Sequence, residues 1–270
     1  MTSTEDSEKN DAQAMRLVEV AVKQGATFVC LPECFHMLGR NANESRDVAK
    51  RYCIEEYQKL AKRLGVWLSL GGIHRIKDKE VKMSNVHVIL NDGGEVVCEY
   101  EKIHLFDVKI PGRVSLMESE STKPGDYLKI CNTPFGKLGL SVCYDVRFPE
   151  LYSRLAEAGA EILLIPAAFT QTTGMAHWEV LLRARAIENQ CYVLASAQTG
   201  RHNEKRISYG DAMIVDPWGT VRARGGSTTE NLVLVTDIDL KRQRQIRKSM
   251  PKLSHRRPDI YRSKVIMSNI

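Results

Sequence analysis

Three side chains of different chemistry each follow a stretch that the sequence predicts to be a buried strand. Glu33 comes after the apolar run 26–31, and Lys102 and Cys143 also follow strand patterns. A thiolate can attack a carbonyl carbon, a carboxylate can move protons, and an ammonium group can stabilise an oxyanion. Functional residues of α/β folds gather at strand ends. The shared placement therefore favours acyl transfer at one site, although spacing alone does not bring the three together.

Each of these residues also has an ordinary role that fits it when taken alone. Glu33 fits a surface or capping glutamate, Lys102 a solvated charge, and Cys143 a buried structural cysteine. His104 likewise fits a satisfied structural histidine. A catalytic role would need burial to raise the pKa of Glu33, and a helix N-terminus and a basic group to lower the pKa of Cys143.

Helical and strand patterns alternate along the chain, interrupted by hairpin signals. Apolar spacing and Gly or Pro boundaries predict helices over 11–24, 54–64, 149–158 and 176–190. Strands are predicted over 26–31, 66–70, 86–90, 95–100, 127–131, 137–142, 161–165, 191–197, 212–215, 221–224 and 232–238. Hairpins mixed with helix–strand units predict a layered α/β sandwich of mixed sheets.

Composition limits the classes of protein to which the chain can belong. The chain has 270 residues, 43% of them hydrophobic, and a net charge of +6. We predict a single domain over 1–261 and a short tail over 262–270. No apolar run reaches the ~20 residues that span a bilayer, and no signal pattern opens the chain. Nucleic-acid binding, suggested by the basic run 241–248, is explained more simply by the exposed face of a terminal helix.

The cysteines do not predict disulfides or a metal site. Seven cysteines cannot all pair, and their low density favours a reduced compartment. Cys30, Cys34 and His36 are close together, but no second ligand pair follows at zinc-site spacing. We expect no metal.

Three ordered segments resemble the signature segments of the carbon–nitrogen hydrolase (nitrilase) superfamily. They are LPECF at 31–35, YEKIHLF at 100–106 and LSVCYDVRFPE at 140–150. The resemblance implies an α-β-β-α sandwich and an amidase without a cofactor. It also implies roles for five groups, which are Glu33 as general base, Lys102 as oxyanion stabiliser, Cys143 as nucleophile, Glu118 (less favoured, Glu120) as second glutamate and the Tyr144 backbone N–H as oxyanion donor.

Further segments, at 174–188, 197–206, 209–210 and 216–220, resemble the Nit branch of that superfamily. Membership of that branch would imply hydrolysis of deaminated glutathione to 2-oxoglutarate and cysteinylglycine, a metabolite-repair reaction. Two alternatives stay open: an omega-amidase or other carbon–nitrogen hydrolase, and an inactive truncated isoform that acts as an interaction protein.

A substrate with two carboxylates needs cations. Arg201, His202, Lys205 and Arg206 form a basic cluster that could receive a carboxylate, unless they are a solvated loop. Arg147, which follows the nucleophile, could do the same or make a structural ion pair. His177 is expected to pack near the pocket.

The resemblance also predicts how the chain departs from its relatives. A first core strand is expected before the segment at which this chain begins, so we expect the 270-residue form to be less stable than an extended one. A homodimer or homotetramer is expected, with no membrane or nucleic-acid partner. The expected location is the cytoplasm, with a mitochondrial address for a longer N-terminal form.

Overall fold

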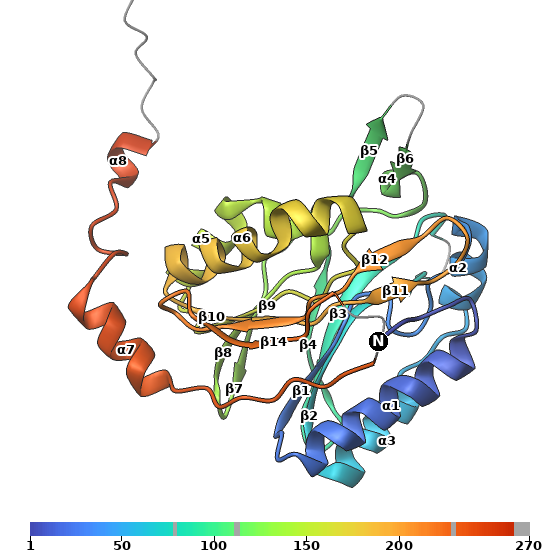
Figure 1. The fold of residues 1–270 in the computed structure, drawn as a ribbon, viewed down its shortest axis with the longest axis horizontal. Helices are drawn as coiled ribbons and strands as arrows, with labels where there is room; N and C mark the ends of the chain where they lie inside the picture. Colours follow the sequence, from blue (N-terminus) through green and yellow to red (C-terminus); the bar gives the residue numbers. More distant parts are fainter. Residues whose placement is uncertain (78–79, 111–113, 228–230, 262–270) are drawn as a thin grey trace, which may run out of the picture.

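The computed structural model describes residues 1–77, 80–110, 114–227 and 231–261. Two β-sheets pack against each other between layers of helices (Figure 1). One sheet has the strand order β1-β2-β3-β4, and the other has the order β14-β13-β10-β9-β8-β7. Both sheets are mixed, because each combines parallel and antiparallel pairs.

The first sheet is built from the N-terminal half of the chain. Its strands are β1 (Phe28–Leu31), β2 (Trp67–Arg75), β3 (Ser84–Leu90) and β4 (Val96–Glu101). Helices α1 (Ser7–Lys23) and α3 (Glu55–Leu64) cover its outer face (Figure 1). The apolar spacing of α1 explains this packing, since Ala14, Val18 and Ala21 fall on one face and are buried. Gly65, in the left-handed conformation, ends α3.

The second sheet follows from the remaining strand patterns. Its strands are β7 (Ile130–Thr133), β8 (Gly136–Leu140), β9 (Ile162–Leu164), β10 (Tyr192–Ala195), β13 (Met213–Val215) and β14 (Val221–Arg224). Helices α5 (Pro149–Glu157) and α6 (Gln171–Asn189) cover its outer face, and Pro149 at the first turn suits the start of α5. A third cluster fills the space between the sheets, with Ile89 and Tyr100 on one side and Leu140 and Leu164 on the other. These layers confirm the predicted α-β-β-α sandwich.

Several smaller elements lie outside the predicted pattern. They are α2 (Ala42–Ala49), β5 (Asp107–Ile110), β6 (Val114–Met117), α4 (Glu118–Ser121), a 3-10 turn over Cys143–Arg147, β11 (Thr199–Arg201), β12 (Ile207–Tyr209) and α8 (Pro258–Tyr261). Helix α7 (Leu240–Ser249), by contrast, agrees with the expected terminal helix over the basic run. No helix in the described ranges is long and apolar enough to cross a membrane.

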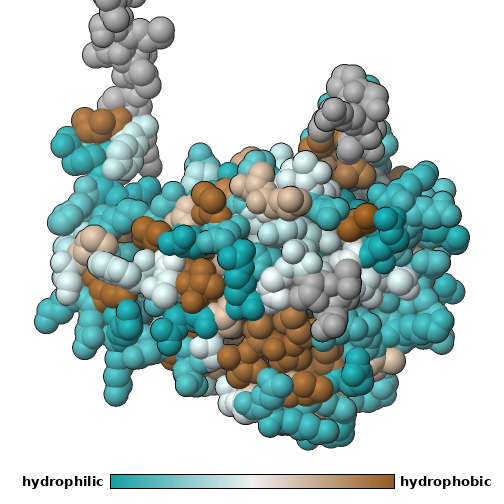
Figure 2. Space-filling model, viewed as in Figure 1, coloured by the Kyte–Doolittle hydropathy of each residue, from teal (hydrophilic) through white to brown (hydrophobic). Residues whose placement is uncertain are grey.

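The strand predicted over 232–238 is wrong. This segment lies beside a cavity of about 420 Å³ whose other walls include β1 and β10. No backbone hydrogen bond joins residues 232–238 to another described residue. The apolar pattern therefore gives a segment that is not paired with a neighbouring strand. Figure 2 shows a hydrophobic patch over this part of the surface. In the described chain β1 pairs only with β2. The expectations that a first core strand is absent and that its absence lowers stability stay predictions.

A buried histidine links the two sheets and makes stability depend on pH. His87 on β3 contacts Ser69 Oγ at 2.7 Å through Nε2 and the Ser141 carbonyl at 3.0 Å through Nδ1. Burial lowers the pKa of His87 to about 4 from the ordinary 6.5. The unfolded chain therefore binds this proton more tightly, so His87 lowers the free energy of unfolding as the pH falls from 6.5 to 4, by about 3 kcal/mol.

We expect His87→Gln to flatten the fall in unfolding free energy across this window, because glutamine does not titrate. Urea unfolding at several pH values between 7 and 4 measures the two slopes. The exposed His177→Gln change is the matched control and should keep the wild-type slope. Parallel curves for His87→Gln and the wild type would contradict the assignment.

Candidate active site

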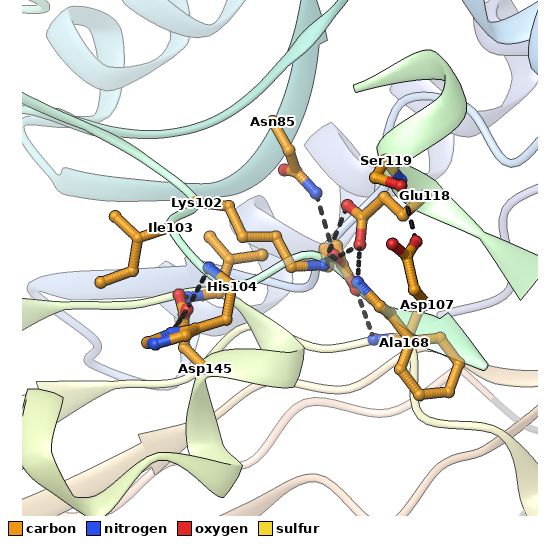
Figure 3. Close-up of polar contacts among 12 residues, drawn as sticks. Asn85, Lys102, Ile103, His104, Asp107, Glu118, Ser119, Asp145 and Ala168 are labelled. Carbon is orange, nitrogen blue, oxygen red and sulfur yellow. Dashed lines mark hydrogen bonds and ion pairs between the residues drawn. The ribbon is translucent and has the colours of Figure 1, made fainter. Parts of the chain in front are cut away.

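A lysine and two glutamates meet in a buried cluster between the ends of the sheets. Lys102, directly after β4, places Nζ 3.1 Å from Glu33 Oε1 and 3.0 and 2.9 Å from the two carboxylate oxygens of Glu118 (Figure 3). Lys102 and Glu33 are 2% and 5% exposed. Glu118 also accepts a hydrogen bond from the Phe106 backbone N–H at 2.7 Å, which fixes its carboxylate against the lysine.

Glu33 is held from several sides. Its Oε1 accepts a hydrogen bond from the Asn85 side chain at 3.0 Å, and its Oε2 accepts one from the Ala168 N–H at 3.1 Å. The β2–β3 register shifts where Gly71 and Gly72 interrupt β2, and this irregularity makes room for the glutamate. Gly72 has φ +64°, and a Cβ there would lie 2.7 Å from Glu33 Cγ.

The nucleophile candidate occupies a strained backbone position. Cys143 begins the 3-10 turn after β8 with φ 48°, and its N–H donates to the Pro166 carbonyl at 2.8 Å. Such a conformation is rare for a residue with a side chain and is found at functional sites. It places the thiol where it donates a hydrogen bond to Glu33 and accepts one from the Ala168 N–H.

The electrostatics reverse two expectations from sequence. Burial and the charge of Glu33 raise the pKa of Cys143 well above its ordinary value, so the thiol is not predisposed to ionise. Burial alone would raise the pKa of Glu33, but Lys102 and the hydrogen bonds from Cys143 and Asn85 outweigh it and lower that pKa. The expected pKa directions for both residues are therefore wrong. The resting site holds a thiol and a carboxylate.

Lys102 stays charged in this buried position. Burial would lower its pKa, but the carboxylates of Glu33 and Glu118 outweigh burial and hold the pKa of Lys102 well above its ordinary value. The site therefore has a permanent cation next to the thiol. A cation held in a pocket stabilises negative charge that develops during a reaction.

A second set of contacts holds the loop that carries the nucleophile. Asp145 is fully buried, and its Oδ2 accepts hydrogen bonds from the Val142 N–H at 2.8 Å and the Tyr100 hydroxyl at 2.7 Å. Its Oδ1 accepts one from the His104 N–H and contacts His104 Nδ1 at 2.8 Å. His104 thus has the structural role that the sequence analysis considered for it. The Tyr144 N–H, next to the thiol, makes no hydrogen bond with a described residue and so is available to a ligand.

A cavity of about 280 Å³ opens over the cluster. Its lining includes Glu33, Lys102, Glu118, Cys143 and Tyr144, so the structure brings together the five positions that the resemblance implied. In the described residues no group of three or more His, Cys, Asp or Glu side chains could hold a metal ion.

The predicted substrate-binding residues divide into two groups. Arg147 lines the cavity, packs over the Phe169 ring, and contacts His177 Nδ1 at 3.1 Å. His177 is exposed and is absent from the lining. Three others also lie away from the lining: Arg201 and Lys205 are exposed, and His202 is buried between the Ser3 carbonyl and Ser208 Oγ.

Sequence reasoning missed several residues of the site. Asn85 and the Ala168 N–H, which hold Glu33, lie in strand and loop segments with no distinctive spacing. Asp145 lies inside the nucleophile segment, two residues after the cysteine, and this position was the available signal, whereas its contacts with Tyr100 and His104 are seen only in the fold. Arg206 was named in the basic cluster with Arg201, His202 and Lys205, and only the fold shows that it alone of the four lines the cavity.

The arrangement can perform acyl transfer. The Cys143 thiol can lose its proton to Glu33 as sulfur attacks a carbonyl carbon, and Lys102 Nζ and the Tyr144 N–H can hold the oxyanion. The proton on Glu33 can then reach the departing atom, and the same carboxylate can activate water. All of these groups line one cavity.

Comparisons with known proteins agree with this chemistry. The family model described as carbon–nitrogen hydrolase matches residues 1–248. A protein of Bos taurus named deaminated glutathione amidase is 52% identical over 97% of this chain and 81% of its own length.

Solved structures share the fold. The Caenorhabditis elegans NitFhit protein has a TM-score of 0.89 and 48% identity over 97% of this chain, which spans 64% of that protein. Saccharomyces cerevisiae Nit3, described as a member of branch 10 of the nitrilase superfamily, has a TM-score of 0.82 and 29% identity over 93% of this chain and 91% of its own.

Proposed function

The chain belongs to the carbon–nitrogen hydrolase family, and from that membership we propose that it is an amidase that hydrolyses deaminated glutathione to 2-oxoglutarate and cysteinylglycine. The observation that carries the proposal is the buried contact of Glu33, Lys102 and Glu118 beside the Cys143 thiol. The name of the similar Bos taurus protein supports the substrate.

In the proposed reaction Cys143 Sγ attacks the amide carbon while its proton moves to Glu33. The tetrahedral oxyanion lies between Lys102 Nζ and the Tyr144 N–H. Glu33 then protonates the leaving nitrogen, cysteinylglycine departs, and a thioester of 2-oxoglutarate remains on Cys143. Water loses a proton to Glu33, attacks the thioester and releases 2-oxoglutarate, and the thiol recovers its proton.

Glu118 does not need to move a proton in this cycle. Its carboxylate accepts three short hydrogen bonds, two from Lys102 Nζ and one from the Phe106 N–H, so we assign it a positioning role. By fixing Nζ, it limits the reorganisation needed when the oxyanion forms.

The assay that tests the function is release of 2-oxoglutarate and cysteinylglycine from deaminated glutathione by the purified chain, with the Cys143→Ala chain as blank. We expect kcat/KM for this substrate to exceed that for 2-oxoglutaramate, the substrate of an omega-amidase. The opposite order would favour the omega-amidase alternative. A folded chain that hydrolyses neither compound would contradict the proposal and favour the interaction-protein alternative.

Assembly and cellular address are separate proposals. Helix α6 exposes Met175, Val180 and Ile187, which supports a helix-mediated contact between copies in a homodimer or homotetramer. The cytoplasmic address, and the mitochondrial address of a longer form, stay predictions.

A further inference from the structure

Arg206 is the one member of the basic cluster 201–206 that lines the active-site cavity. It lies at the end of the turn between β11 and β12. The turn is closed by the His202 N–H, which donates to the Arg206 carbonyl at 3.0 Å, and by the Arg206 N–H, which donates to Asn203 Oδ1 at 2.9 Å. These contacts direct residue 206 inward, whereas its neighbours Arg201 and Lys205 remain exposed.

A single residue, Ala168, links the guanidinium of Arg206 to the proposed base. Its Nη2 donates to the Ala168 carbonyl, and the N–H of Ala168 donates to Glu33 Oε2 at 3.1 Å. A group bound to Arg206 would therefore be next to the reacting atoms. Phe169 and Thr170, which follow Ala168, line the same cavity.

The rest of the guanidinium has no partner in the described chain. Its Nε is buried and makes no hydrogen bond, and no described carboxylate lies within ion-pair distance of it. A buried donor on a charged group is costly when it is unpaired, so such groups normally have a protein, water or ligand partner. Arg147, the other arginine of the cavity, differs because it contacts His177 and two aromatic rings.

Charge balance indicates what kind of ligand fits. Glu33, Glu118 and Lys102 alone would give the cavity a net charge of −1, which repels an anionic substrate. Arg147 and Arg206 reverse the sign. A guanidinium is suited to carboxylates because its donors form a planar fork.

We propose that Arg206 receives a carboxylate of the substrate on its guanidinium and so makes the enzyme selective for anionic amides. The inference rests on the proposed function, since it concerns the substrate of that same site. The carboxylate belongs either to the acyl portion or to the leaving dipeptide, and the two sources are distinguished by the substrates used.

The test measures kcat and KM of the wild type, Arg206→Gln and Arg206→Lys on three amides. These are deaminated glutathione, the same compound with its glycine carboxylate converted to an amide, and a neutral amide without carboxylates. Arg206→Gln should lower kcat/KM for deaminated glutathione about 10- to 100-fold, mainly through KM, and for the neutral amide less than about threefold. Arg206→Lys should recover part of the loss, and the exposed Arg201→Gln is the matched control.

The second substrate identifies the carboxylate. If Arg206 binds the glycine carboxylate, Arg206→Gln should hardly change kcat/KM for the amidated compound. If Arg206 binds the carboxylate of the acyl portion, the loss of kcat/KM should be the same for the amidated compound as for deaminated glutathione. Equal losses on charged and neutral amides would overturn the proposal, because they indicate that Arg206 only holds the Ala168 carbonyl.

A binding measurement separates this inference from the proposed function, because it needs no turnover. Glutarate and pentane-1,5-diol, a neutral molecule of the same length without an amide bond, are compared for protection of Cys143 against iodoacetamide. We expect glutarate to protect the wild type at a lower concentration than the diol, and Arg206→Gln to remove most of that difference. A preference that survives in Arg206→Gln would contradict the inference even if deaminated glutathione is the substrate. A wild type that is inactive on deaminated glutathione but shows this Arg206-dependent preference would contradict only the proposed function.

Discussion

Replacement of Cys143 by alanine should lower amide hydrolysis about 10⁴-fold or more while leaving the fold intact. The change removes the sulfur positioned against Glu33, so no thioester can form at position 143, and Cys34, the other thiol in the described lining of the cavity, stays protonated because burial raises its pKa. Alanine fits the space and accepts the positive φ about as well as cysteine does. Product release under saturating substrate, together with a urea unfolding curve, measures both effects.

The matched control is the exposed Cys53→Ala, which should keep wild-type activity. Mass spectrometry of enzyme quenched during turnover adds an independent readout. A mass increase equal to the acyl group should be present in the wild type and in Cys53→Ala and absent in Cys143→Ala. Retention of more than a few per cent of activity by Cys143→Ala would show that another group performs the attack.

Replacement of Glu33 by glutamine should have opposite effects on catalysis and on the reactivity of the thiol. Hydrolysis should fall about 10²- to 10⁴-fold, because glutamine cannot take the thiol proton or activate water. Alkylation of Cys143 by iodoacetamide near pH 7 should become faster. Burial, the charge of Glu33 and its hydrogen bond raise the pKa of Cys143, whereas Lys102 lowers it. Removing the carboxylate leaves burial opposed by the cation, so the pKa falls and the thiolate fraction increases.

Two measurements on the same variant test this prediction. The rate of alkylation at position 143 is followed by peptide mass spectrometry over pH 6–10, and hydrolysis is assayed on the same preparation. The partly exposed Glu101→Gln, which removes a carboxylate paired with Lys77, should change neither rate. If both rates fell in Glu33→Gln, Glu33 would be needed to ionise the thiol in the free enzyme, and the electrostatic account would be wrong.

The layered fold could be predicted from sequence because its elements have strong local patterns. The helical spacing of α1 and α6, and the apolar runs at β1 and β9, are each enough to predict an element. The segment 232–238 shows the limit of this reasoning. Its residues have strand propensity, yet a strand also needs a neighbour, and in the described chain none lies within hydrogen-bonding reach.

The members of the site were easier to predict than their ionisation. Lys102 and Cys143 lie in recognisable segments, but the pKa of each depends on how close Glu33 lies, which sequence spacing does not contain. Likewise Arg201 and Arg206 are chemically identical. Only the turn contacts that set their directions distinguish a solvated arginine from one in the cavity.

The irregular glycine pair in β2 has a consequence for inherited variation. Gly72 carries no functional group, so a change to alanine at this position would be graded as conservative by chemistry alone. The added methyl group would lie 2.7 Å from Glu33 Cγ and 2.9 Å from Asn85 Oδ1, on a backbone that already disfavours side chains. In a survey of coding variants, Gly72→Ala should therefore be classed with substitutions of Glu33 itself. Where the fold accommodates the methyl group, the protein should be present at a normal level but inactive. Where the fold does not accommodate it, the level of folded protein should fall.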